Sequence, residues 1–132
     1  MKKSLTLLSS VLLTSAVLIA PAFAAVDVED AMKDMSKSYR LVMNADDAAS
    51  LKKDLATFRA AAVEAQSGIP DKMKKQPADS TERKIYAEGI QKLINQVDVV
   101  SKLADEGKVP EAKAEAAKLK ELMKEYHSKL GV

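Results

Sequence analysis

Residues 86–104 read YAEGIQKLINQVDVVSKLA, and this stretch decides the fold class. Its apolar side chains recur every three or four residues, at Tyr86, Ile90, Leu93, Val97, Val100 and Ala104. This spacing places them on one face of an α-helix, because a helix completes a turn about every 3.6 residues. Polar residues occupy most of the other positions, so the stretch predicts a long amphipathic helix with one buried face.

Three further segments show the same spacing, and each predicts another amphipathic helix. The first apolar stripe consists of Val28, Met32, Met35, Tyr39 and Val42. The second consists of Ala48, Leu51, Leu55, Phe58, Ala62 and Ala65. The last, which follows residues 86–104, consists of Val109, Ala112, Ala116, Leu119, Met123, Tyr126 and Leu130. No segment alternates apolar and polar residues as a strand does, so the sequence predicts an all-α fold.

Two short connections are expected, one between the first and second helices and one between the third and fourth. Asp46 and Asp47 precede the second stripe, where they favour a turn and an N-cap. Gly107 ends the third segment, and Pro110 suits the first turn of the fourth. Each of these connections is short enough to make the helices that it joins antiparallel neighbours.

One longer connection, residues 67–80, joins the second helix to the third. Asp79 or Ser80 can cap the third helix, and Glu82 offers a capping box with Asp79. The basic cluster at residues 72–75 is interpreted as a solvated loop rather than as a docking patch. Four helices joined by two short loops and one longer loop predict an antiparallel, up-down-up-down four-helix bundle.

Residues 1–24 predict a secretory signal peptide. Lys2 and Lys3 precede an apolar stretch, and Ala22-Phe23-Ala24 matches a small-residue cleavage signal. No other segment has the roughly 20 apolar residues of a spanning helix, so no membrane insertion is expected. Residues 25–132 are therefore expected to form one soluble, monomeric domain in an exported compartment, most simply the periplasm.

Composition excludes several classes of function. Removing Lys2 and Lys3 from the 21 basic residues leaves 19, which equals the 19 acidic residues, so no nucleic-acid partner is indicated. The chain has no Cys, which excludes iron–sulfur clusters, cysteine zinc sites and covalently attached haem. A di-iron site needs two Glu-x-x-His pairs, but Lys124 stands three residues before the only histidine, His127.

His127 and Met32 are the candidate metal ligands. At about 1.5 Å rise per residue, Met32 lies about 7–8 Å from one end of the predicted bundle. The same arithmetic places His127 about 5 Å from that end and on the flank of its stripe. A thioether and an imidazole at one level can hold haem iron from both sides. Met35 is about 12 Å deep and matches His127 less well.

Ordinary structural roles are the more common explanation of both residues at this point. A methionine on an apolar stripe often fills the core, and a histidine near a helix C-terminus often serves as a surface cation. Under that interpretation the protein is a haem-free periplasmic interaction or stress-adaptor protein. A Ser–His–Asp hydrolase has no support, because the sequence contains no nucleophile-elbow motif.

Five sequence blocks resemble the soluble cytochrome b562 family. They are VEDAM (28–32), ADDAA (45–49), RAAA (59–62), ADEGKV (104–109) and YH (126–127), and their spacing matches without gaps. The resemblance implies one non-covalent haem b held by Met32 and His127. It also implies a one-electron carrier, not an enzyme, that exchanges electrons with unidentified redox proteins in transient contacts.

The chain departs from a familiar member of that family in its expected pocket. Tyr86 and Ile90 stand where that member has phenylalanines, and the sequence ends in Gly131-Val132 rather than in a basic residue. Haem packing and propionate contacts are therefore expected to differ. The residues expected to form the pocket wall by their level in the bundle are Met35, Gly89, Ile90 and Leu130.

Overall fold

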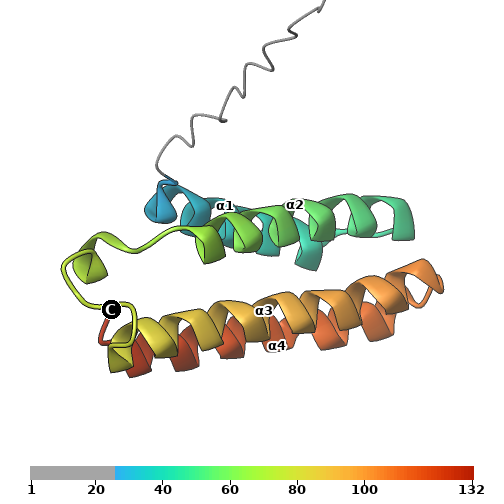
Figure 1. Ribbon diagram of the computed structural model, residues 1–132. Helices are drawn as coiled ribbons and strands as arrows, with labels where there is room; N and C mark the ends of the chain where they lie inside the picture. Colours follow the sequence, from blue (N-terminus) through green and yellow to red (C-terminus); the bar gives the residue numbers. More distant parts are fainter. Residues whose placement is uncertain (1–25) are drawn as a thin grey trace, which may run out of the picture.

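The computed structural model describes residues 26–132 and shows four α-helices and no strand in that range (Figure 1). The helices are α1 (Val28–Asn44), α2 (Ala48–Ser67), α3 (Thr81–Asp105) and α4 (Val109–Leu130), with a 3-10 turn, η1 (Asp71–Met73), between α2 and α3. None of these four helices is long and apolar enough to cross a membrane. The predicted signal peptide, residues 1–24, lies outside the described residues.

Consecutive helices run antiparallel and pack side by side. The pairs α1–α2, α3–α4 and α2–α3 are in extensive contact, whereas α1 and α4 touch much less. The start of α1, the end of α4 and η1 all lie at one end of the bundle (Figure 1). The predicted all-α, up-down-up-down bundle is therefore confirmed.

The predicted stripes form the core. All six stripe residues of α3 are at most 8% exposed, and in α2 only Ala48 is not fully buried. The stripes of α1 and α4 are less complete, because five of their residues remain half-buried: Met32, Tyr39, Val109, Met123 and Leu130. Met32, Met123 and Leu130 lie at the site end of the bundle, where α1 begins and α4 ends.

The seam between α1 and α4 differs at its two ends. At the far end, the small side chains of Ala112 and Ala116 are completely buried. Lys113 Nζ there donates a hydrogen bond of 3.1 Å to the Ala45 carbonyl and joins α4 to the end of α1. At the site end the stripes carry longer side chains, among them Met32 and Met123, that are only half-buried. The two ends of the seam therefore differ in the size of the side chains that line them.

Polar caps fix where the helices begin. Asp27, Asp47 and Ser80 accept hydrogen bonds from the backbone of Asp30, Ser50 and Arg83, as N-cap residues do. The capping box expected between Asp79 and Glu82 is wrong. Ser80 provides the cap instead, and the Glu82 carboxylate accepts a hydrogen bond from the side chain of Gln76.

Gly107 ends α3 as predicted. Its φ of 73° is in the left-handed region, which costs little for glycine. The Gly107 N–H donates to the Ala104 carbonyl, and the Lys108 N–H donates to the Leu103 carbonyl. This pair of bonds is a Schellman motif, which reverses the chain into α4, where Pro110 lies in the first turn.

The connection between α2 and α3 has more structure than a polar loop was expected to have. The η1 turn inserts Met73 against the core, and only 4% of this residue is exposed. Lys72, Lys74 and Lys75 around it are exposed, so the charges of the basic cluster are solvated as expected. The connection therefore packs against the end of the bundle.

The Asp47 cap gives a pH-dependent prediction. The Ser50 N–H donates to the carboxylate over 2.7 Å, and this bond lowers the pKa of Asp47. Because the folded pKa is below the unfolded one, the stabilisation is complete above the unfolded value of about 4 and is lost at lower pH. We expect Asp47→Ala to lower Tm at pH 7 and the difference from wild type to shrink towards pH 3, as followed by circular dichroism.

Asp46→Ala is the matched control, because no hydrogen bond of the Asp46 side chain is found among the described residues. This variant should melt close to wild type at pH 7. An Asp47→Ala difference that stays constant down to pH 3 would contradict the capping role of the carboxylate.

Candidate functional site

An apolar hollow lies at the site end of the bundle, between α1, α3 and α4. It consists of an inner cavity of about 70 Å³ and an outer cavity of about 250 Å³. Met32, Tyr86, His127 and Leu130 line both cavities, so the two adjoin. The hollow therefore lies at the end of the bundle where α1 begins and α4 ends.

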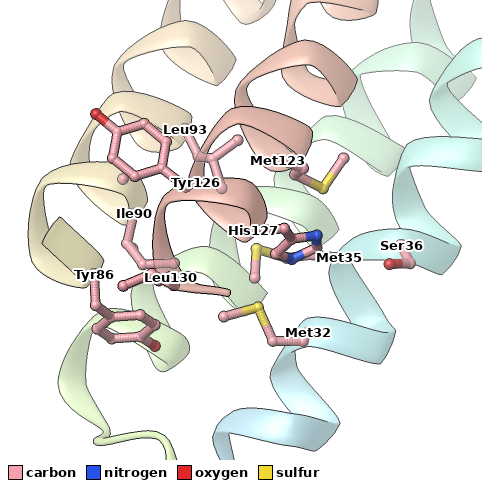
Figure 2. Close-up of a pocket in the computed structure, with 11 residues that line it drawn as sticks. Met32, Met35, Ser36, Tyr86, Ile90, Leu93, Met123, Tyr126, His127 and Leu130 are labelled. Carbon is pink, nitrogen blue, oxygen red and sulfur yellow. The ribbon is translucent and has the colours of Figure 1, made fainter. Parts of the chain in front are cut away.

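Met32 and His127 reach this hollow from different helices. Figure 2 shows the thioether of Met32 from α1 and the imidazole of His127 from α4 directed into it. Met32 is half-buried, whereas His127 lies at the mouth of the hollow and is exposed. The structure thus brings the two candidate ligands together, with His127 more open to solvent than its flank position indicated.

Tyr126 explains why His127 lies at the mouth. Tyr126 occupies the buried position of the stripe and is only 6% exposed. Its ring packs directly on Gly89 of α3, where an added Cβ would lie 2.5 Å from the Tyr126 Cδ1 atom. Since consecutive helical residues point about 100° apart, the next side chain, His127, turns towards the edge of the hollow. Glycine at position 89 therefore helps to set the rotation of α4.

A cation also holds the Tyr126 ring. Lys129 Nζ lies 4.7 Å from the ring centroid, which is within the range of a cation–π contact. The Glu125 carboxylate accepts a bond of 2.9 Å from the same Nζ atom and fixes the lysine in place. The Tyr126 ring is thus held by contacts with both Gly89 and Lys129, and the orientation of His127 depends on this packing.

Met35 is a second thioether at the hollow. It lines the inner cavity together with His127 (Figure 2). Only 1% of Met35 is exposed, as expected of a core residue. Gly89, Ile90 and Leu130 also line the inner cavity, so all four residues expected in the wall are found there.

Tyr86 forms a wall of both cavities and is tied to α2. Its hydroxyl donates a hydrogen bond of 2.5 Å to the Ala65 carbonyl near the end of that helix. Burial, with a smaller contribution from the nearby Glu29 carboxylate, raises the pKa of Tyr86 to about 12. The hydroxyl therefore stays protonated and keeps the ring in place over the physiological pH range.

Several wall residues were not predicted. Ser36, Leu93 and Met123 line the inner cavity, and periodicity had indicated only a core role for the last two. Glu29, Pro70, Lys72 and Met73 line the outer cavity. No pattern in the sequence shows that η1 folds back to this end, so its wall residues could not be found without the fold.

The fold and the hollow define a class of protein, the cofactor-binding four-helix bundles, in which side chains of facing helices surround the cofactor. The family model described as Cytochrome b562 matches residues 27–130, and the chain belongs to that family. The relative named "Probable soluble cytochrome b562 2" of Yersinia pestis is 38% identical over 128 residues, 97% of each chain. A second, "Probable soluble cytochrome b562 1" of Yersinia pestis, is 30% identical over 112 residues, 85% of this chain and 88% of that one.

Membership makes the chain a helical-bundle cytochrome. The family comprises haem electron carriers that are not enzymes, so the prediction that this chain is not an enzyme is confirmed. The resemblance drawn from the five sequence blocks is confirmed as well.

The Tyr86 hydroxyl gives a prediction about the wall of the hollow. Tyr86→Phe removes the bond to Ala65, whose carbonyl still accepts from the Gly68 N–H at 3.3 Å, so no acceptor is left unpaired. We expect a loss of about 1 kcal/mol in the free energy of unfolding at pH 7, measured in urea. Tyr39→Phe is the control, because no hydrogen bond of its hydroxyl is found within residues 26–132.

The contribution of the Tyr86 hydroxyl to the free energy of unfolding should depend on pH in the alkaline range. The folded pKa of Tyr86, about 12, is above the unfolded value of about 10, so its stabilisation is complete below pH 10. The stabilisation is lost as the pH rises through 12, and the difference between wild type and Tyr86→Phe should narrow there. Equal stability of the two proteins at pH 7 would show that the hydroxyl contributes nothing.

Proposed function

We propose that this chain is a periplasmic one-electron carrier that binds one non-covalent haem b, with Met32 and His127 as the axial ligands. The observation that carries the proposal is that these two side chains line one hollow from different helices. Imidazole nitrogen and thioether sulfur are a donor pair that holds haem iron in cytochromes.

The residues of the hollow fit haem b in three respects. Its inner wall is built mainly of apolar side chains such as Ile90, Leu93 and Met123, which suit a porphyrin face. The sparse contact between α1 and α4 leaves a seam for a flat ligand. The ligand atoms of Met32 and His127 are accessible rather than locked in the core.

Haem supplies reversible one-electron chemistry when it is bound. A thioether ligand favours the ferrous state and raises the reduction potential. Met32 and His127 would hold the iron with two protein donors, which would leave it no open site for oxygen or peroxide. The apolar walls exclude water, and the packed Tyr126 holds the orientation of His127, so little rearrangement accompanies electron transfer.

Location and partners complete the proposal. The predicted signal peptide at residues 1–24 supports export to the periplasm. The proposed carrier is a monomer that meets its redox partners in transient contacts. The alternative function is a haem-free periplasmic interaction or stress-adaptor protein. The visible spectrum of the protein mixed with haemin distinguishes the two functions.

If Met32 and His127 hold the iron, replacing Met32 by leucine should change the visible spectrum of the haem, whereas replacing Met35 by leucine should not. Protein with one equivalent of haemin is reduced, and its visible spectrum and haem affinity are measured. Met32→Leu should lose the sharp low-spin α and β bands, because leucine cannot ligate iron. His127→Ala should lose them too, and each variant should bind haem at least about tenfold more weakly.

Met35→Leu is the matched control, since it removes the other thioether of the hollow at little cost in core volume. This variant should keep the low-spin bands. Bands retained in Met32→Leu but lost in Met35→Leu would reassign the sulfur ligand. A wild-type protein that stays colourless with haemin would favour the haem-free adaptor.

A further inference from the structure

Lys72 brings a positive charge to the mouth of the hollow. It lies in η1 and lines the outer cavity together with Met32 and His127. Among the residues that line either cavity, it is the only lysine or arginine. The apolar hollow therefore has one lysine side chain at its edge.

The charges around η1 leave Lys72 without a partner. Lys74 pairs with Asp71, and its pKa is raised chiefly by that hydrogen bond, with smaller contributions from Glu29 and Asp27. Lys72 forms no ion pair within the described part of the chain, residues 26–132. Asp71 thus pairs with Lys74, and no carboxylate among the described residues pairs with the ammonium of Lys72.

The backbone on both sides of Lys72 is fixed. The Met73 N–H donates to the Pro70 carbonyl over 2.8 Å, and the buried Met73 side chain anchors the turn. The Asp71 N–H donates to the Glu29 carboxylate over 3.4 Å and ties the turn to α1. The Lys72 side chain therefore starts from a defined point on the cavity wall.

We infer that Lys72 binds the propionate carboxylates of the haem, and this inference rests on the proposed function. Haem b has an apolar ring with two carboxylates on one edge, so burial of the ring leaves the carboxylates at the mouth of the hollow. The Glu29 carboxylate on the same wall repels them. Lys72 offsets that repulsion and supplies a charge-assisted hydrogen bond.

Comparing haem with its ester distinguishes a contact between Lys72 and the propionates from a general effect of the Lys72 substitution on haem binding. Haemin and haemin dimethyl ester, which lacks the propionate charges, are each titrated into wild type, Lys72→Gln and Lys75→Gln. Lys75 is exposed in the same connection but lines neither cavity, so it is the matched control. Titrations at about 10 mM ionic strength keep electrostatic screening weak.

We expect Lys72→Gln to weaken haemin binding about threefold, as suits an exposed ion pair, and to leave binding of the ester unchanged. Lys75→Gln should bind both compounds like wild type. The difference between wild type and Lys72→Gln should disappear in about 0.5 M salt, where the pair is screened.

An equal loss of affinity for haemin and its ester in Lys72→Gln would overturn the propionate contact, and so would no loss for either. If wild type still shows low-spin bands, those results overturn this inference alone. A wild type that binds neither compound overturns the proposed function and the inference together.

Discussion

Room for a ligand exists because α1 and α4 are in sparse contact and leave a hollow at the end where α1 begins and α4 ends. Buried alanines and the Lys113–Ala45 hydrogen bond join the two helices at the far end. At the site end, the half-buried Met32 and Met123 line the hollow. The antiparallel order of the helices then places the beginning of α1 beside the end of α4, so residues about one hundred positions apart share one hollow.

Packing around the hollow sets the orientation of His127. Gly89 admits the Tyr126 ring, the ring fixes the rotation of α4, and His127 consequently turns to the mouth. Tyr86 keeps the opposite wall in place through the Ala65 carbonyl. An apolar wall with donor atoms at its edge suits a cofactor that is largely apolar and binds through its metal.

Much of this arrangement follows from the sequence, because helix periodicity and rise are local properties. The stripe in residues 86–104 is buried as predicted, and the estimated levels of Met32 and His127 agree with their shared hollow. Periodicity could not predict that His127 is exposed, because that depends on where the Tyr126 ring packs. It also could not show that η1 brings Lys72 and Met73 to the site, since that contact depends on the tertiary fold.

Iron K-edge X-ray absorption of the haem-loaded protein tests the central claim most directly, because it counts sulfur atoms bound to the iron. The account predicts one sulfur ligand in wild type and in Met35→Leu, and none in Met32→Leu. An iron site without sulfur in wild type, or a sulfur that persists in Met32→Leu, would contradict it.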